Sequence, residues 1–477
     1  MQIKLSRILS VLLTSVVVLS CQDDWQFSSD NRYVLNFSVD TVKMDTVFTG
    51  VASASGQFMV YNWNEAGVRL DAVLAGGAES PFRINLDGQG GTQITDLEIP
   101  AGDSLYCFVS VNIPESGSAE LFYAFDSIRF IMESGNVQYV RLSAYGQNAV
   151  RLKGKRIETD TTLTARLPYI IYDSLYVAEG ATFKLEKGTR LYFHSGAVLD
   201  VAGRLVAQGT TDSMIVMRGD RLDLMLPELP YDLLAGQWGG IRFRSSSYGN
   251  ELTGCDIHGG NWGVIADSSD LSNVKVSISS SIIHNVNGNC IEATGCRIEV
   301  ANSQITNAGK SCVDIAGGLS DFTFCTIAAF SLWNIADQAV MLTDRRGDII
   351  VPFEGASFRN CIITGYHTSE FTVNVADSIR NSVPYSISNS LLMVSDTSDT
   401  RFNNVVFEKN SEKAYGPSNF VDRTIRKYSS VFALDSLSRA RGIADTLSVV
   451  WPVDLNGTPR PLAGADAGCF QYKPPVN

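Results

Sequence analysis

Two carboxyl residues at a repeating interval are the clearest candidates for chemistry. Glu292 and Asp314 each directly follow an apolar residue, Ile291 and Val313, and these apolar residues are 22 positions apart. If the two segments stack on adjacent turns of the chain, both carboxyl groups face outward, about 5 Å apart, as in retaining glycosidases. Plain surface carboxylates and a weak cation site are the alternatives. Glu292 and Asp314 are therefore the catalytic hypothesis.

Two histidines form a second spaced pair. His258 and His284 are 26 residues apart, and Asp256 stands beside the first. Paired imidazoles could contact a ligand, act as a general base or bind a metal. However, the next equivalent positions are Thr306 and Ala328, so stacked polar residues are the alternative. With 4 histidines in all and no paired Cys/His spacing, the sequence predicts no metal centre and no cofactor, and a surface calcium ion is left open.

Aromatic and cationic residues in predicted loops complete the candidate ligand-binding set. Trp262 and Trp333 could stack on sugar rings, or could instead cover the core. Arg345 and Arg346 could hold a uronate or sulfate through paired hydrogen bonds, or could pair with the aspartates that flank them. The ligand-binding hypothesis therefore comprises His258, His284, Trp262, Arg345 and Arg346.

The overall composition limits the class of protein. The chain has 477 residues, of which 45% are apolar and 18% charged, so it can bury a large core and is not disordered as a whole. Lys and Arg total 38 against 50 Asp and Glu, giving a net charge of −12. Nucleic-acid binding depends on clustered cations, so no nucleic-acid partner is expected.

Short alternating segments dominate the first third of the chain. Residues 25–150 contain predicted strands such as 33–39, 57–61 and 106–111, separated by turn residues. Alternation with period two and frequent turns predict a β-sandwich. The turn Pro100-Ala101-Gly102-Asp103-Ser104 resembles one found in immunoglobulin-like bacterial modules, which implies a domain of that kind. A polar stretch at 148–164 is the predicted linker.

A longer repeat begins near residue 165. Glycines recur every six to eight residues through Gly209, and a 22- to 36-residue repeat follows. The repeat has columns of equivalent positions. A reference apolar column comprises Ile257, Ile283, Ile305, Ile327, Ile363 and Leu392; two positions earlier stand Cys255, Ser281, Ser303, Cys325, Cys361 and Ser390; three earlier stand Gly254, Ser280, Asn302, Phe324, Asn360 and Asn389; a later apolar column comprises Val264, Ile291, Val313 and Ile335. Such columns predict a solenoid whose coils bury one another's apolar face.

These motifs resemble the right-handed parallel β-helix of the pectate-lyase-like superfamily. The resemblance implies an all-β chain with an N-terminal β-sandwich followed by a right-handed parallel β-helix over 165–477. Residues 453–470 resemble the closing segment of cell-surface β-helix proteins, which implies a cap over the last coil. The Asn-Thr-Asp, Gly-His-Gly and Arg-Ile-Lys motifs of polygalacturonase-like enzymes are absent. No catalytic role is therefore carried over from the family.

Two groups of cysteines belong to this repeat. Cys255, Cys325 and Cys361 share a column with serines and are interpreted as small packing residues. Cys290 and Cys312 are equivalent positions on consecutive coils, within reach of a disulfide, so a bridge and a pair of free thiols both remain open.

The N-terminus resembles a lipoprotein signal peptide over residues 1–21. A short apolar run from Ile8 to Leu19 follows Lys4 and Arg7, and it leads into Ser20-Cys21. This resemblance implies lipidation of Cys21 and a membrane partner reached through the lipid. Asp23 and Asp24 resemble the surface-export signals of some outer-membrane lipoproteins, so the expected location is the exposed face of the outer membrane.

These features together predict a lipid-anchored, non-catalytic surface protein that binds a glycan or an envelope protein. The alternative is a polysaccharide lyase or glycoside hydrolase acting on the outer face of the β-helix. Convergent polar residues in one groove would favour the enzyme, whereas dispersed charges would favour binding.

Overall fold

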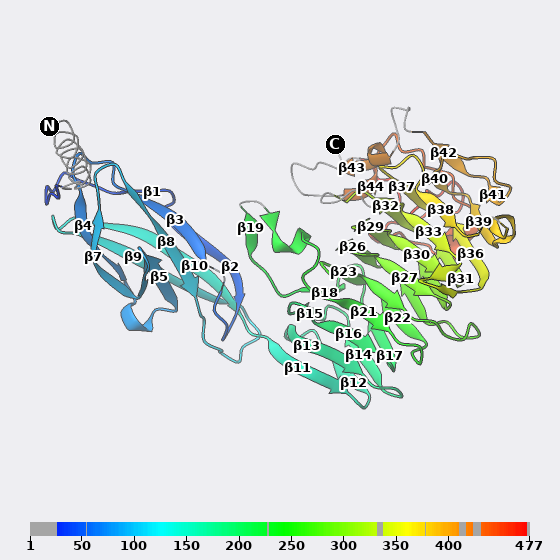
Figure 1. Ribbon diagram of the computed structural model, residues 1–477, viewed down its shortest axis with the longest axis horizontal. Coiled ribbons are helices and arrows are strands. Elements are labelled where there is room, and N and C mark those ends of the chain that lie inside the picture. The colour runs from blue at the N-terminus through cyan, green and yellow to red at the C-terminus, as the bar shows by residue number, and fades with distance from the viewer. Residues whose placement is uncertain are drawn as a thin grey trace, which may run out of the picture. The chain divides into compact units, whose positions relative to one another are not determined.

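The chain folds into two compact β units that divide after Asn148. The computed structural model describes residues 26–474 except 54, 227–228, 332–336, 377, 410–415 and 423–430. Across these ranges the regular elements are β-strands and short 3-10 turns, with no α-helix (Figure 1). The predicted all-β class, a sandwich followed by a parallel solenoid, is confirmed.

The first unit is a sandwich of two five-stranded sheets. One sheet has the order β1 (Asn36–Phe37), β3 (Gly56–Tyr61), β8 (Ser104–Val111), β5 (Phe82–Leu86), β6 (Gln89–Gly91); the other has β2 (Thr41–Phe48), β10 (Val137–Gln147), β9 (Phe122–Met132), β4 (Val68–Leu74), β7 (Gln93–Ile99). The strands alternate buried and exposed residues, as along β9 with Ile128, Phe130 and Met132 buried. All of these pairings are antiparallel except that of β10 with β2.

The second unit is a solenoid of parallel strands. An 18-stranded sheet takes two strands from each regular coil: β11 (Val150–Ile157), β13 (Tyr169–Val177), β15 (Arg190–Phe193), β16 (Val198–Val201), β18 (Ile215–Gly219), β21 (Gly240–Phe243), β23 (Cys255–His258), β24 (Val264–Ala266), β26 (Ile282–Val286), β27 (Ile291–Thr294), β29 (Gln304–Ala308), β30 (Val313–Ala316), β32 (Thr326–Ala329), β33 (Val340–Thr343), β37 (Ile362–Gly365), β38 (Phe371–Asn374), β40 (Leu391–Met393) and β42 (Val406–Glu408). A ten-stranded sheet takes the third: β12 (Thr161–Leu163), β14 (Thr182–Glu186), β17 (Arg204–Gln208), β22 (Asn250–Thr253), β25 (Val276–Ser279), β28 (Arg297–Ala301), β31 (Gly318–Thr323), β36 (Phe353–Arg359), β39 (Tyr385–Ser388) and β41 (Phe402–Asn403). β11 and β12 fill most of the segment predicted as a linker and already pair within these sheets.

The predicted register of the solenoid is confirmed for its reference column. Ile257 pairs with Ile283, and the pairing continues through Ile305, Ile327, Ile363 and Leu392. The side chains of this column are buried, so equivalent residues stack into one continuous core.

The later apolar column departs from the prediction after Val313. Val264, Ile291 and Val313 pair as expected, but the next partner of Val313 is Val340. Ile335, the predicted partner, lies outside the described residues. The insertion between β32 and β33 lengthens this coil, so counting a fixed number of residues from Ile327 misses the strand.

A left-handed residue forms the bend between two strands of every regular coil. Gly254, Ser280, Asn302, Phe324, Asn360 and Asn389 all have φ between 46° and 59°. Glycine and asparagine tolerate this conformation most easily, which explains the small polar column read from the sequence.

The column of small residues that directly follows these bend residues hydrogen-bonds as well as packs. The thiols of Cys255, Cys325 and Cys361 each donate to the carbonyl two residues earlier, at 3.4–3.5 Å. The hydroxyls of Ser281 and Ser390 make the same bond, at 2.7–2.8 Å. The same carbonyls also accept a backbone N–H from the preceding coil, so the side chains add a second hydrogen bond at each bend.

The closing segment covers a side of the solenoid. Its described part includes β43 (Phe420–Asp422) and β44 (Val431–Leu434), and Leu455, Cys469 and Phe470 pack with them against the outward side chains Ala328, Ile362 and Leu391 (Figure 1). Backbone N–H groups of Gly468 and Cys469 donate to Asn360 O and Thr326 Oγ1. These contacts reach several coils along the outer face, whereas the sequence implied a cap over the last coil.

Candidate functional site

Glu292 and Asp314 lie side by side on the outer face of the solenoid. Glu292 is the second residue of β27 and Asp314 the second of β30, and the two are register partners. Both side chains are partly exposed. The sequence therefore placed this pair correctly on adjacent coils.

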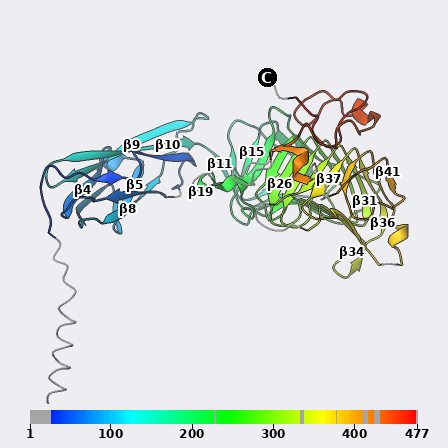
Figure 2. The same cartoon turned by 90° about the horizontal axis from the view of Figure 1, so that it is seen from above.

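Arg346 forms ion pairs with both carboxylates of this pair. It comes from β34 (Arg345–Arg346), which forms a hairpin with β35 (Ile349–Ile350) in the insertion between β33 and β36 (Figure 2). Its Nη1 and Nη2 lie 3.0 and 3.1 Å from the two oxygens of Asp314, and its Nε lies 3.9 Å from Glu292 Oε1. Asn289 Nδ2 donates to Glu292 Oε2 at 2.8 Å and to Asp314 Oδ2 at 3.2 Å.

The arrangement suits stable ion pairing better than acid–base catalysis. A retaining glycosidase needs one carboxyl group protonated to act as the acid. Arg346 instead occupies both oxygens of Asp314 through two parallel hydrogen bonds, and Asn289 bonds an oxygen of each carboxylate. The candidate anion-binding arginine and the candidate catalytic carboxylates are therefore parts of one ion-paired network. We call it the Arg346 cluster (Arg346, Asp314, Glu292 and Asn289).

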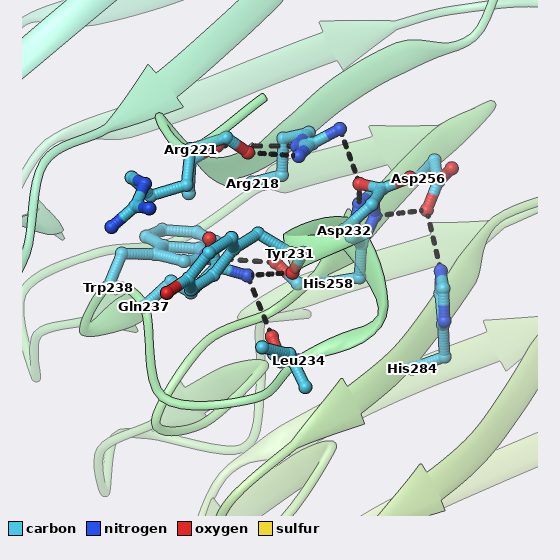
Figure 3. A network of polar contacts seen from close by, with 11 residues as sticks. Arg218, Arg221, Tyr231, Asp232, Leu234, Gln237, Trp238, Asp256, His258 and His284 are labelled. Carbon is cyan, nitrogen blue, oxygen red and sulfur yellow. Dashed lines mark hydrogen bonds and ion pairs between the residues drawn. The ribbon is translucent and has the colours of Figure 1, made fainter. Parts of the chain in front are cut away.

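The two predicted histidines also meet, on a different part of the outer face. His258 ends β23 and His284 lies in β26, and they are register partners with ring centroids 4.7 Å apart (Figure 3). Asp256 Oδ1 lies 2.9 Å from His258 Nδ1 and 3.2 Å from His284 Nε2. Across the parts of the chain that the structure describes, these are the residues whose His, Cys or carboxylate atoms converge closely enough to hold a metal ion.

A loop before the regular repeat supplies further members of this cluster. Asp232 lies in a 3-10 turn (Tyr231–Leu233), and its Oδ1 is 2.7 Å from His258 Nε2 and 2.5 Å from Arg218 Nη1. Gln237 Nε2 donates to the carbonyls of Tyr231 and Leu234 and so holds the turn over the histidine (Figure 3). The sequence did not point to Asp232 because the loop falls outside the repeat and carries no register.

The backbone of His258 is fixed from inside the solenoid. Trp238 is fully buried and stacks on Phe193 with ring centroids 4.2 Å apart. Its indole N–H donates to the carbonyl of His258 at 2.8 Å. The imidazole is therefore positioned by the core on one side and by Asp232 on the other.

The charges in this cluster are strongly coupled. Burial alone would lower the pKa of His258, but the charge of Asp256 and the bonds to Asp232 and Asp256 outweigh it and raise that pKa to about 9. Burial alone would raise the pKa of Asp256, yet the two histidines hold it far below its usual range. The pKa of Asp232 is also lowered, by His258 and Arg218 against the effect of burial.

The remaining predicted ligand residues do not converge on either cluster. The Trp262 ring packs against Gly240, where an added Cβ would meet the indole at 2.5 Å, so it fills a gap between coils. Arg345 is half-exposed, with its Nε 3.8 Å from Asp344. Trp333 and the lipidation site Cys21 lie outside the described residues. Cys290 and Cys312 are free buried thiols.

Two buried acids were not anticipated. Glu370 accepts backbone N–H groups from Ala339 and His367, at 2.8 and 2.7 Å, and burial raises its pKa to about 7. Glu408 accepts from Thr364 Oγ1, Asn419 Nδ2 and the N–H of Gly416, and burial raises its pKa too. Both hold loops against the later coils, and neither follows the residue pattern of the repeat.

Comparisons with known proteins leave the family open. No family model matches the chain, and no curated protein matches it. Solved structures that match include a protein of unknown function from Porphyromonas gingivalis W83 (15% identity, 27% of this chain and 50% of that chain, TM-score 0.18). Another is a family 123 glycoside hydrolase from Clostridium perfringens, with 12% identity, 26% of this chain and 26% of that chain covered, and a TM-score of 0.19. A third is the N-terminal domain of PorA, with 14% identity, 24% of this chain and 97% of that chain covered, and a TM-score of 0.18.

The chain spans half the length of the first of these structures and about a quarter of the second. Scores of this size carry no inference about function. Among the described residues, no helix has the length and apolar character that crossing a membrane requires.

Proposed function

We propose that this protein is a lipid-anchored, non-catalytic binding protein of the outer-membrane surface, whose ligand is a glycan or another component of the envelope. The Arg346 cluster is the observation that carries the proposal. Arg346 and Asn289 already occupy oxygens of both candidate catalytic carboxylates, which supports a structural role for the pair in place of acid–base catalysis.

A binding role is further supported by exposed aromatic side chains on the first unit. Tyr123 and Phe125 of β9 stack with ring centroids 6.1 Å apart, and Tyr145 of β10 lies 5.0 Å from Tyr123. Phe125 is 73% exposed. Clustered rings on an open sheet face are typical of surfaces that contact other molecules.

A paired screen for retention and turnover tests the proposal. The full-length protein is passed over columns of neutral, uronate and sulfated glycans and envelope extract, and turnover is followed by reducing ends and by ultraviolet absorbance of unsaturated products. We expect the wild type to be retained on a column without turnover. Retention should fall in a Phe125→Ala/Tyr145→Ala variant and should be kept in Tyr139→Ala, which removes another exposed ring from β10. Turnover that disappears in Glu292→Gln/Asp314→Asn would contradict the proposal and establish the lyase or hydrolase alternative.

The anchor is tested separately. We expect a Cys21→Ala variant to lose incorporation of labelled fatty acid and to leave the membrane fraction. Incorporation that survives this change would rule out Cys21 as the lipidation site.

A further inference from the structure

We propose that Asp256, His258 and His284 form a binding site for a divalent transition-metal ion of the zinc class. The inference is independent of the proposed binding function. It rests on the way the solenoid stacks these three side chains and on the groups that surround them (Figure 3).

The donor atoms already stand at distances that a small ion needs. One donor atom from each of the three residues lies within 4.8 Å of the other two. Asp256 Oδ1 is 2.9 Å from His258 Nδ1 and 3.2 Å from His284 Nε2. Bonds of about 2.0–2.2 Å to zinc place neighbouring tetrahedral ligands about 3.3 Å apart. Small side-chain rotations would therefore bring all three donors onto one ion.

The donor set selects the class of ion. Two imidazole nitrogens and one carboxylate oxygen suit zinc, cobalt and related transition ions. Calcium and magnesium prefer sets made of oxygen alone. This site therefore differs from the surface calcium that the sequence left open.

The surrounding groups provide the outer hydrogen bonds that metal-binding histidines use. Asp232 Oδ1 lies 2.7 Å from His258 Nε2, so it can accept that N–H while the metal ion takes the place of the proton on Nδ1, the nitrogen beside Asp256. Arg218 in turn holds Asp232. A carboxylate behind a ligating imidazole fixes the tautomer and strengthens the ligand, and its loss lowers metal affinity about 10- to 100-fold.

The site is buried on one side and partly exposed on the other. The side chain of His258 is only 5% exposed, whereas those of His284 and Asp256 are 20% and 26% exposed. Three protein ligands leave at least one position for water or an outside ligand. The ion can therefore enter from solvent and can present an open position to a bound molecule.

Metal titration of the full-length protein tests the inference. Metal-free protein is titrated with zinc against a chromophoric chelator, and cobalt is used as a spectroscopic probe of nitrogen and oxygen ligands. We expect one zinc per chain and a rise in thermal stability on binding. We also expect His284→Gln and Asp256→Asn each to weaken zinc binding at least tenfold, and calcium to bind far more weakly.

His194→Gln is the matched control. His194 is another histidine paired with a carboxylate, 2.7 Å from Asp220, but it is exposed and has no second histidine beside it. We expect this variant to keep wild-type zinc affinity, with circular dichroism confirming that all variants fold. Failure of the wild type to bind zinc, or equal losses in His194→Gln and His284→Gln, would overturn the site and leave an ion-paired histidine cluster.

Discussion

At the scale of single residues, Asp232 is a positioning residue for His258 and is not one of the three proposed metal ligands. It touches His258 on the nitrogen that faces away from Asp256 and His284. We expect Asp232→Asn to weaken zinc binding about tenfold while the cobalt spectrum keeps its shape, because the three ligands remain. Nitrogen NMR of the imidazole should show a changed tautomer balance for His258 in this variant. An unchanged affinity would mean that Asp232 only holds its loop.

Glu370 makes the stability of the protein depend on pH near neutrality. Its pKa is about 7 in the folded protein against an ordinary 4.5, because burial disfavours the charged form. Between these values Glu370 is protonated in the folded state and ionised in the unfolded state, so its contribution to stability is lost as pH rises from about 4.5 to 7. His258, with its pKa raised to about 9, adds a separate loss of stability above about pH 6.5. His367 and Glu408 are the charged neighbours that modify this window.

The measurement is the free energy of unfolding by denaturant from pH 5 to pH 8. We expect the wild type to lose on the order of 3 kcal/mol more than Glu370→Gln over this range, because the contribution of His258 is common to both. Glu354→Gln, which removes an exposed carboxyl group on β36, should keep the wild-type slope. Parallel profiles for the two variants would contradict the assignment to Glu370.

At the scale of elements, the left-handed bend decides which residues each coil accepts. Ser280 has φ of 46°, where a β-branched side chain clashes with its own backbone. We expect Ser280→Val to lower the free energy of unfolding by about 2 kcal/mol, and Ser280→Asn to be neutral or slightly stabilising. Ser277→Val, an outward position in the adjoining β25, should have little effect. Equal losses of unfolding free energy in Ser280→Val and Ser277→Val would show that the left-handed conformation does not restrict the residue type at position 280.

The column of small residues that contains Cys361 and Ser390 also affects stability, through its side-chain hydrogen bonds. Ser390 Oγ accepts the backbone N–H of Cys361 at 2.9 Å, and both groups are buried. We expect Ser390→Ala to cost about 1–2 kcal/mol in thermal or denaturant unfolding, because a buried donor loses its partner. Cys361→Ser should be close to neutral, since the hydroxyl can replace the thiol in its bond to the carbonyl of Arg359. A large loss in Cys361→Ser would instead indicate a packing requirement for sulfur.

These elements also explain what the sequence could and could not reveal. The columns through Ile257 and Gly254 repeat on every coil, so periodicity alone placed Glu292 beside Asp314 and His258 beside His284. Arg346 and Asp232, which decide the chemistry of those pairs, come from insertions that have no repeat and hence no predictable register. The solenoid was therefore predictable and its loops were not.

At the scale of the whole molecule, the two units have separate cores. The buried cluster of the first unit ends at Ala144, and that of the second begins at Ile157. Asn148 is tied to the first unit through Thr49, Ser116 and Ser118, and Val150 already begins β11. We expect two calorimetric unfolding transitions and a stable fragment from 149 onward after limited proteolysis. A single cooperative transition would show that the units stabilise each other.

Arg460 joins the closing segment to coils far away in the sequence. It is buried, its guanidinium lies 4.1 Å from the Phe324 ring centroid, and its Nη2 donates to Asn302 Oδ1 at 2.8 Å and to Gly468 O at 3.1 Å. Asn302 and Phe324 are both left-handed bend residues, so one cation from the C-terminal segment ties together two consecutive bends of the solenoid.

Removing this cation should release the segment before the solenoid unfolds. Arg460→Met keeps most of the apolar stem but leaves Asn302 Oδ1 and Gly468 O without the donor, at a cost of about 2–3 kcal/mol. We therefore expect faster proteolysis and amide exchange across 431–474 while the stacked strands β26 to β32 stay protected. Lys473→Met, at an exposed position of the same segment, should exchange like the wild type. If the whole solenoid lost protection together in Arg460→Met, the closing segment would be part of its cooperative core and not a detachable side cover.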